Sequence, residues 1–475
     1  MTTVLDNLLP FKYRAAGALK DAHLKTAIDR TTQTAESRRT AAVEGFENFA
    51  NARSRSRKIK DHVIANLDHY LAKFERNAIA SGAKVHWART SQEACEIVID
   101  ICKDNEAKSA TRSKSMLGEE IGLPHALSDA GITRVETDLA EHIVQLADEA
   151  PSHIIFPAMH KRREDVAELF EQKHAIKPDS ESVPDLVMSA RRELREKFLN
   201  ADVGISGANF LIADTGAVCT VTNEGNAELT TTPPRVHIVT AGIEKLVPSM
   251  DHAAILLRVL VRSATGGDFT QYTTFHCGPK RTADVDGPDQ FHIVLVDNGR
   301  TRMMREGLSE MLRCIRCGAC MNHCVVYRQI GGHAYGSTYP GPMGSVLTPA
   351  FEGIAKAREL PHACTLNGKC AEVCPIEIPL PTLLRGWRDR SWKEGLEPRT
   401  VRAGIGLWTF VATRPWLYRL ATRLAIFGMQ RFSRGGKIRT LPLAGGWTKT
   451  RDFPAPAKES FMQAYAKAKS SGDLP

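Results

Sequence analysis

The sequence predicts an α/β fold with a mixed, mostly parallel sheet, followed by a small helical, cysteine-rich domain and a helical, basic C-terminal region. Helical periodicity alternates with short β-rich runs between residues 57 and 300, a pattern typical of a parallel sheet covered by helices. Seven of the eleven cysteines fall between positions 314 and 374, and the chain beyond residue 385 is rich in Lys and Arg.

Length and composition indicate several folded domains. The chain has 475 residues, too many for one ordinary core, and its 43% hydrophobic and 25% charged residues are typical of a globular protein. We place the boundaries where composition changes. They delimit an N-terminal helical extension, the α/β domain, the cysteine-rich domain and the basic C-terminal region, at residues 1–56, 57–300, 301–385 and 386–475.

The α/β domain begins with an amphipathic segment at residues 61–82, which predicts one helix ending at a glycine. Alternation then predicts strands at 84–88, 131–138 and 153–158 and helices at 91–104 and 139–148. The run "ANFLIADTGAVCTVTNEGN" differs, because two apolar stretches joined by "DTG" predict a β-hairpin. "RVHIVTAG" predicts a further strand, so the sheet is expected to be mixed.

Two stretches of the cysteine-rich domain repeat one motif. "CIRCGACMNHC" places cysteines at positions 314, 317, 320 and 324, with spacings of two, two and three residues. "CTLNGKCAEVCP" keeps that frame at Cys364, Cys370 and Cys374, but its second slot holds Asn367.

This spacing is typical of two-cluster ferredoxins, in which three cysteines of one motif hold one cluster and the fourth holds the other. The prediction is therefore that Cys314, Cys317, Cys320 and Cys374 hold one [4Fe–4S] cluster. The remaining cysteines, Cys324, Cys364 and Cys370, would hold a second cluster, with Asn367 at its open corner. Zinc sites also use C-x2-C, but zinc does not explain four cysteines in this spacing and their near repetition.

The chemistry expected of this domain is one-electron transfer. Amide oxygen is a weaker iron ligand than thiolate, so we expect the second cluster to be [3Fe–4S], or [4Fe–4S] with a labile iron. The sequence contains neither G-x-G-x-x-G after a strand nor a P-loop, so no dinucleotide or nucleoside triphosphate site is indicated. We assign no catalytic residue.

Together these motifs resemble the lactate-utilisation protein B family, an iron–sulfur subunit of a bacterial three-protein L-lactate oxidation system. "SKSMLGEEIGL", "ISGANFLIADTGAVCTVTNEGN" and "HCGPKR" resemble its lactate-utilisation domain, and the likeness runs from roughly residue 50 to 450. It implies a sheet of the ribose-phosphate isomerase and coenzyme A transferase type, and electron transport from L-lactate alongside partner subunits. The family usually writes its second motif C-x2-C-x3-C-P, whereas here Asn367 replaces the first cysteine.

Two alternatives remain open at the level of sequence. The chain could serve another 2-hydroxy acid or a quinone reductase as an electron-transfer subunit. Alternatively, the α/β domain could itself bind or convert a ligand, with the clusters as redox sensors. In the favoured interpretation the chain is not catalytic alone.

Some polar groups of the α/β domain have both a functional and a structural interpretation. Residues 113–115, "SKS", suit an anion site but are also typical of a solvated loop, which we favour. Residues 204–209 bring glycines near a ligand or form a tight turn. Glu224 in "TNEGN" suits a catalytic carboxylate, yet Asn, Glu and Gly are typical turn residues, and we favour the turn.

A further group, Asp138, Glu141 and His142, suggests a metal, but we expect a helix cap and an exposed helical face instead. The four cysteines outside the motifs are interpreted as small buried hydrophobes: Cys95, Cys102, Cys219 and Cys277.

The C-terminal region is strongly basic. Between Arg385 and Arg451 there are fifteen Lys or Arg against three Asp or Glu, interleaved with tryptophans 387, 392, 408, 416 and 447. This pattern predicts docking to an acidic partner subunit first and contact with an anionic membrane surface second. No nucleic-acid module accompanies the charge. No secretory signal and no run of about 20 apolar residues is present, so we expect a cytoplasmic protein, with peripheral contact at the inner membrane face as the alternative.

Overall fold

The computed structural model describes residues 9–175, 177–441 and 445–471. The chain separates into two compact units, Met1–Glu394 and Gly395–Pro475. The domain boundary predicted at residue 56 falls inside one helix, and all of the predicted α/β and cysteine-rich domains lie within the first unit. The finer domain scheme therefore stays a prediction.

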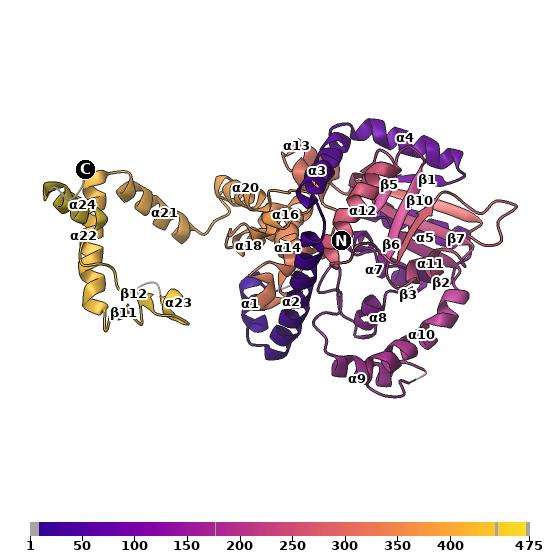
Figure 1. Cartoon of the computed structure of the whole chain (residues 1–475), viewed down its shortest axis with the longest axis horizontal. Coiled ribbons are helices and arrows are strands. Elements are labelled where there is room, and N and C mark those ends of the chain that lie inside the picture. Colours follow the sequence, from indigo (N-terminus) through magenta and orange to yellow (C-terminus); the bar gives the residue numbers. More distant parts are fainter. Residues whose placement is uncertain (1–8, 176, 442–444, 472–475) are drawn as a thin grey trace. The chain divides into compact units, whose positions relative to one another are not determined.

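A six-stranded parallel sheet forms the centre of the first unit (Figure 1). Its order is β1 (Lys84–Ala88), β10 (Gln290–Val296), β7 (Val236–Gly242), β4 (Val203–Gly207), β2 (Ser109–Arg112) and β3 (Thr133–Glu136). Every neighbouring pair is parallel. All residues of β7 are buried, as expected of a strand covered on both faces.

The direction of the chain reverses between β2 and β4. From β2 the chain moves outward to β3, whereas from β4 it moves the opposite way to β7 and then β10. Such a switch point opens a crevice at the carboxyl ends of the two strands, where α/β proteins bind ligands.

One face of the parallel sheet is covered by α5 (Ser91–Asp104), α6 (Met116–Ile121) and α7 (Leu123–Asp129), which share a core with the strands. Against the other face pack α3 (Phe49–Ala65), α4 (Leu67–Ala80) and residues of a second sheet. That sheet has the order β8 (Leu246–Val247), β5 (Phe210–Ile212), β6 (Ala217–Thr222) and β9 (Tyr272–His276).

The predicted hairpin is present, since β5 and β6 pair antiparallel around the turn at Gly216, while β5 and β8 are parallel. The expected mixed, mostly parallel α/β fold is therefore confirmed. The remaining helices of this part are α8 (Leu139–Leu146), α9 (Arg163–Lys173), α10 (Val183–Leu199), α11 (Asn226–Thr231), α12 (Met250–Ala264), α13 (Arg300–Arg305) and the short η1 (Ile243–Lys245).

Three predicted elements are wrong. Residues 153–158 form no strand, because the His153 ring accepts hydrogen bonds from the amides of Ile155 and Phe156 at 3.0 and 3.1 Å and so replaces a sheet ladder. The helix expected over 61–82 is divided between α3 and α4 at Asn66. The third is in the cysteine-rich domain, where the sequence "SVLTPAFEGIAKAREL" predicts one helix over 345–360. That helix breaks at Gly353, whose φ is 89°.

The cysteine-rich segment consists of short helices joined by loops. They are η2 (Ser309–Arg313), α14 (Ala319–Asn322), α15 (Tyr327–Ile330), η3 (His333–Tyr335), α16 (Gly341–Glu352), α17 (Ile354–Ala357), α18 (Glu359–His362), α19 (Lys369–Glu372) and α20 (Leu380–Lys393). The N-terminal helices α1 (Phe11–Ala18) and α2 (Ala22–Glu44) pack against this segment, and Arg14 donates to the carbonyl oxygens of Ala334 and Tyr335, both at 2.9 Å.

The second unit contains α21 (Arg399–Ala412), α22 (Pro415–Phe432), α23 (Gly445–Thr448), α24 (Phe461–Ser470) and a two-stranded sheet of β11 (Lys437–Ile438) and β12 (Phe453–Pro454). No residue of α21 or α22 is buried. Large apolar side chains are open to solvent instead, with Trp408 66% exposed, Trp416 68% and Phe427 71%. Across the described parts of the chain, none of the helices combines the length and the hydropathy that crossing a bilayer requires.

Candidate functional site

The two cysteine motifs fold into the same turn. In the first, Arg316 and Gly318 have φ values of 61° and 74°, and in the second Leu366 and Gly368 have values of 58° and 88°. A four-residue helix follows each turn, α14 and α19 respectively. Glycine suits the second left-handed position because it lacks the Cβ that opposes positive φ.

The first cysteine group (Cys314, Cys317, Cys320 and Cys374) surrounds one small cavity. Its other lining residues are apolar: Met311, Ile315, Gly318, Met343, Pro375, Ile376, Ile378 and Leu380. Burial and, less strongly, Cys314 raise the pKa of Cys374 to about 11. Thiols that hinder one another's ionisation in an apolar cavity fit an iron centre, since iron supplies the positive charge that thiolates need.

The second cysteine group consists of Cys324, Cys364 and Cys370. Burial raises the pKa of Cys370 to about 12, and the charges of Cys364 and Cys324 add to the shift, so the three sulfurs are neighbours. Backbone amides donate to two of them, from Leu366 to Cys364 Sγ at 3.2 Å and from Tyr327 to Cys324 Sγ at 3.5 Å. Hydrogen bonds of this kind tune the reduction potential of a cluster.

Asn367 takes in the second turn the place that Cys317 takes in the first. The amide of Ala319 donates to the sulfur of Cys317, and the amide of Lys369 donates to Oδ1 of Asn367 at 3.3 Å. The side-chain oxygen of Asn367 therefore accepts from the backbone amide at the position equivalent to the one that donates to the sulfur of Cys317. Cys317 is buried, whereas Asn367 is exposed, so solvent has access to this corner.

Two arginines of the N-terminal helices lie beside the first cysteine group. Arg53 donates from Nε and Nη2 to the carbonyl oxygen of Cys374 at 3.1 and 2.8 Å, and Arg39 donates to that of Val373 at 2.9 Å. Burial lowers the pKa of Arg39, and the charge of Cys317 opposes that shift. The sequence analysis did not single out these arginines. Arg53 stands in a basic run at 53–58, which is a local signal that could have drawn attention to it, whereas Arg39 has no such signal.

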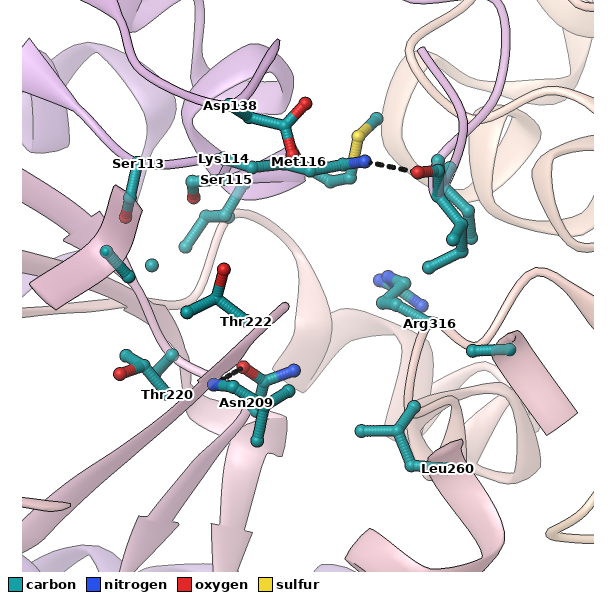
Figure 2. Close-up of a pocket in the computed structure, with 18 of the residues that line it drawn as sticks. Ser113, Lys114, Ser115, Met116, Asp138, Asn209, Thr220, Thr222, Leu260 and Arg316 are labelled. Atoms are coloured by element: carbon teal, nitrogen blue, oxygen red, sulfur yellow. Dashed lines mark hydrogen bonds between the residues drawn. The ribbon is translucent and has the colours of Figure 1, made fainter. Parts of the chain in front are cut away.

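A larger cavity, of about 530 Å³, lies at the switch point of the parallel sheet (Figure 2). Residues 113–115 after β2 and 207–209 at the end of β4 form part of its wall. Ile315, Arg316 and Tyr339 of the cysteine-rich segment form another part. Ile315 also lines the cavity of the first cysteine group, so one residue borders both cavities.

Arg316 is fixed by the α/β domain although it belongs to the first cysteine turn. Its Nη2 lies 3.6 Å from Oε1 of Glu244, and its guanidinium lies 4.7 Å from the ring centre of Tyr339. Burial favours the neutral form of Glu244, but Arg300 and Arg316 hold its pKa at about 2. Burial and Arg316 lower the pKa of the neighbouring Lys245 to about 8. This part of the cavity is therefore rich in cations.

The interpretation of residues 113–115 as a solvated loop is wrong. Ser113 and Ser115 are buried, because the loop is covered where the strand ends converge. Lys114 extends across the cavity and donates from Nζ to the carbonyl oxygen of Ile155 at 2.7 Å (Figure 2).

The turn expected at Glu224 is present, with Gly225 at a φ of 74°, but it also places Glu224 in the cavity wall. Oε2 of Glu224 accepts a hydrogen bond from the amide of Leu139 at 3.0 Å. The residue as a whole is exposed, yet burial of its carboxyl group and the nearby Asp138 raise its pKa to about 7. A carboxyl with this pKa can hold or release a proton near neutral pH.

The expected helix cap is confirmed, since Asp138 accepts hydrogen bonds from the amides of Ala140 and Glu141 at 3.0 and 3.1 Å. The expected exposed face of that helix is wrong, because Glu141 and His142 are buried. His142 lies against His174, with 3.1 Å between their Nε2 atoms. These residues form part of the packing of α8 rather than a solvated surface.

Three of the cysteines outside the motifs, Cys95, Cys102 and Cys219, are buried as expected. Cys277 is exposed, which corrects its interpretation as a buried hydrophobe. Cys277 directly follows β9, at the edge of the second sheet.

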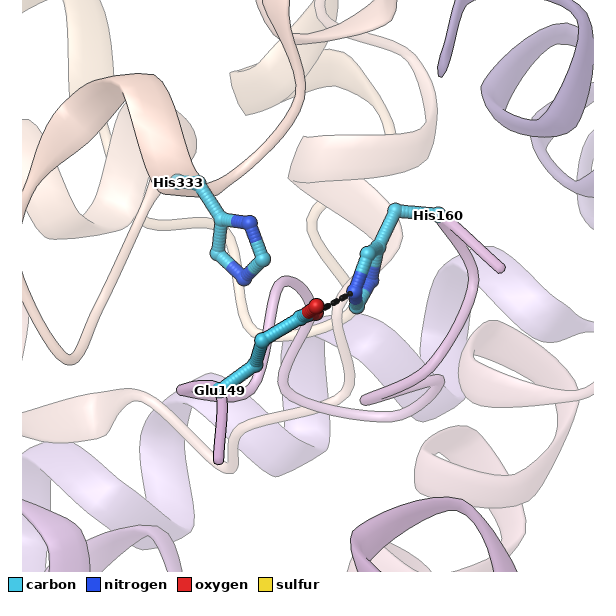
Figure 3. Close-up of side chains that lie close together, drawn as sticks. All are labelled: Glu149, His160 and His333. Atoms are coloured by element: carbon cyan, nitrogen blue, oxygen red, sulfur yellow. Dashed lines mark hydrogen bonds and ion pairs between the residues drawn. The ribbon is translucent and has the colours of Figure 1, made fainter. Parts of the chain in front are cut away.

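A His–Glu cluster joins the α/β domain to the cysteine-rich segment (Figure 3). Nε2 of His160 lies 2.6 Å from Oε2 of Glu149, and Nε2 of His333 lies 2.7 Å from the carbonyl oxygen of Ala150. Lys161 forms an ion pair with the same carboxylate. Because protein groups already satisfy these ligand atoms, we interpret the cluster as a structural joint.

Comparison with protein families matches the chain in three segments. They are a LUD domain at residues 71–296, a 4Fe-4S dicluster domain at 310–378, and the C-terminal domain of lactate utilisation protein B at 393–470. The dicluster match covers both cysteine groups.

Curated relatives named Lactate utilization protein B, from Bacillus thuringiensis (strain Al Hakam) and Bacillus cereus (strain AH187), are each 38% identical over 465 residues. These alignments cover 98% of this chain and 98% of each relative. The crystal structure of a DUF162 family protein from Deinococcus radiodurans matches 48% of this chain and 98% of its own, with 12% identity and a TM-score of 0.28. That likeness is too distant to carry an argument.

Proposed function

This chain belongs to the lactate utilization protein B family, and we propose that it carries electrons through two iron–sulfur clusters as L-lactate is oxidised to pyruvate. In this proposal it is one subunit of a multi-protein complex. The dicluster-domain match and the name of its relatives support an iron–sulfur protein of lactate utilisation. The observation that carries the finer proposal is the gathering of seven cysteines into two neighbouring groups.

The first cysteine group would ligate one [4Fe–4S] cluster, with Cys374 reaching it from the second motif. The shared apolar cavity supports this assignment. The second cysteine group would supply three thiolates to the other cluster, and the close charges of its sulfurs support that set. Burial and the charges of cysteines from both groups raise the pKa of Cys320. The two sites are therefore adjacent, as a relay of single electrons requires.

The type of the second cluster depends on Asn367. Its oxygen has the backbone partner that a ligating sulfur has in the first turn, and amide oxygen binds iron more weakly than thiolate. We therefore infer a [4Fe–4S] cluster with one easily lost iron, or a [3Fe–4S] cluster.

Oxidation of lactate itself would begin on a partner subunit, and the clusters would supply only one-electron transfer. The chain contains neither a Rossmann glycine fingerprint nor a P-loop, and its relay clusters cannot accept a hydride. We propose that the complex is cytoplasmic.

The second unit would hold this chain to a partner. Its helices α21 and α22 are basic and expose aromatic side chains, and exposed apolar patches rimmed by polar groups mark interaction sites. An acidic surface of a partner subunit is the occupant that fits this charge. An anionic membrane surface is the competing outcome.

The central experiment compares the complex with the isolated chain, both purified without oxygen. The isolated chain should contain roughly seven or eight irons, as two clusters imply, and should not oxidise L-lactate. The complete complex should reduce a dye when lactate is added, and omission of this chain should stop that reduction. Stoichiometric zinc without acid-labile sulfide, or robust lactate turnover by the isolated chain, would overturn the proposal.

The role of the second unit is tested by replacing Arg414, Arg419 and Arg423 with Gln. Assembly should weaken at least several-fold and in a salt-dependent manner, because exposed charges are screened by salt, while the clusters stay unchanged. The matched control replaces three exposed arginines of α10 with Gln, namely Arg191, Arg192 and Arg195. Co-purification with partner subunits and recovery on anionic vesicles separate the two occupants. Unchanged assembly and unchanged vesicle binding would show that the positive charge of this unit only keeps the chain in solution.

A further inference from the structure

The 530 Å³ cavity at the switch point has no part in the electron relay described above. It lies where open α/β sheets bind their ligands, outside the carboxyl ends of β2 and β4. Ile315 borders both this cavity and the cavity of the first cysteine group. A molecule bound here would therefore lie about one side chain from the first cluster.

The size of the cavity indicates a ligand larger than the small acid that the complex would oxidise. Pockets for cofactor-sized ligands have volumes of roughly 300 to 1,000 Å³, and about 530 Å³ lies well inside that range. A three-carbon acid would occupy only a small part of this space.

The walls divide into an apolar side and a polar side, which suits a ligand with a ring and an acid group. The polar residues include Ser113, Lys114, Ser115, Asn209, Thr222 and Arg316. The apolar residues include Met116, Ile154, Phe156, Met159, Val221 and Leu260. Figure 2 shows Arg316 pointing into the space from the side opposite Asn209, beneath the end of Lys114.

The cations near Arg316 favour an anion at this end of the cavity, while Asp138 and Glu224 line the wall that follows β3 and β6. Lys114 donates to a carbonyl oxygen, and among the described residues no carboxylate forms an ion pair with it. Glu244 is shared between Arg300 and Arg316, while the half-buried Lys245 adds a further cation. A phosphate or carboxylate would gain charge-assisted hydrogen bonds from Lys114 and Arg316.

We propose that this cavity binds flavin mononucleotide, with its phosphate between Lys114 and Arg316. The choice of a flavin rests on the proposed electron-transfer function. A flavin accepts an electron pair and returns the electrons one at a time, so beside the first cluster it would join the two-electron oxidation of lactate on the partner subunit to the one-electron relay. Binding itself rests only on the geometry of the cavity.

The test uses the full chain with its clusters, purified without oxygen, and calorimetric titration with flavin mononucleotide, NADH, L-lactate and pyruvate. We expect flavin mononucleotide to bind with one site per chain, and NADH not to bind. Lys114→Met should raise the flavin Kd at least about tenfold, since a charge-assisted contact is lost. Lys108→Met, at the amino end of the same strand and exposed, should leave the Kd unchanged.

A second variant, Ala140→Phe, fills the cavity from a half-buried position and should abolish binding. Unchanged cluster absorbance and unchanged melting show that each variant folds. Binding of flavin mononucleotide that both variants weaken supports the proposal. Absence of flavin binding, binding of only NADH, lactate or pyruvate, or flavin affinity insensitive to both variants overturns it. Because turnover of the complex is measured separately, failure of this site is distinguishable from failure of the relay.

Discussion

The two cysteine turns share a backbone but not a set of ligands. Both have left-handed residues at equivalent positions, a glycine before a short helix, and an amide that donates to the side chain at the second slot. That side chain is Cys317 in the first turn and Asn367 in the second. The backbone and the glycine therefore specify the turn, so one thiolate can be lost while the loop persists.

The surroundings of the two turns also differ. Arg53 lies at the carbonyl of Cys374 and Arg316 lies within the first turn, whereas near the second cysteine group Arg388 reaches the carbonyl of Cys364 at 2.5 Å. Cations raise a cluster's potential, and so does the loss of a thiolate. A ligand atom is much closer to iron than these guanidinium groups, so the lost thiolate dominates. We therefore expect electrons to rest on the second cluster.

The largest effect is expected at the first turn. Cys317→Ser should remove the first cluster, lower the iron content by roughly half and stop electron flow. Cys219→Ser, a buried cysteine in β6, should leave both clusters intact. Iron analysis and paramagnetic resonance of the reduced protein measure both variants. Loss of the second cluster alone from Cys317→Ser would reverse the ligand assignment.

The second prediction removes the difference between the turns. Asn367→Cys should complete eight thiolates, make the second cluster resistant to mild ferricyanide oxidation, and lower its potential toward that of the first. Paramagnetic resonance of the oxidised protein should show a three-iron signal in the native chain and none in the variant.

Asn367→Ala tests whether Oδ1 of Asn367 contributes to the cluster, because this variant removes the oxygen without supplying a thiolate. If the native chain shows no three-iron signal and both clusters resist ferricyanide equally, another residue fills the corner and Asn367 is a silent replacement.

The smallest effect is expected from the arginine that lies beside the first group. Arg53→Gln should lower the potential of the first cluster by roughly 50 mV, as expected for one partly screened charge at this distance, and leave the second nearly unchanged. Arg55→Gln, exposed on the same helix, is the matched control. Redox titration followed by paramagnetic resonance resolves the two clusters. Equal shifts from both variants would show that the potential of the first cluster depends only on the net charge of the chain and not on the position of Arg53.

Features that depend on short-range patterns could be predicted from the amino-acid sequence. The cysteine spacing specifies two related turns because a cluster's corners are reached by residues three or four positions apart. The alternation of helices and strands, the hairpin at "DTG" and the cap at Asp138 likewise depend on neighbours in the chain. Local chemistry could also mislead, as at 153–158, where the His153 side chain takes the amides that a strand would have used.

Which distant residues these local features contact is set by the tertiary structure. Lys114, Glu224 and Arg316 are far apart in sequence. Taken separately, Lys114 suited a loop and Glu224 a turn, while Arg316 is a spacer residue of the first cysteine motif. Lys114 follows β2 of the parallel sheet and Glu224 follows β6 of the second sheet. The packing of these two sheets brings them together, and the cysteine-rich segment adds Arg316, so all three line one cavity. Arg53 reaches the first cysteine group in the same way. The physical reason is that periodicity reports which face of an element is buried, whereas the partner of that face is fixed only when distant segments pack together.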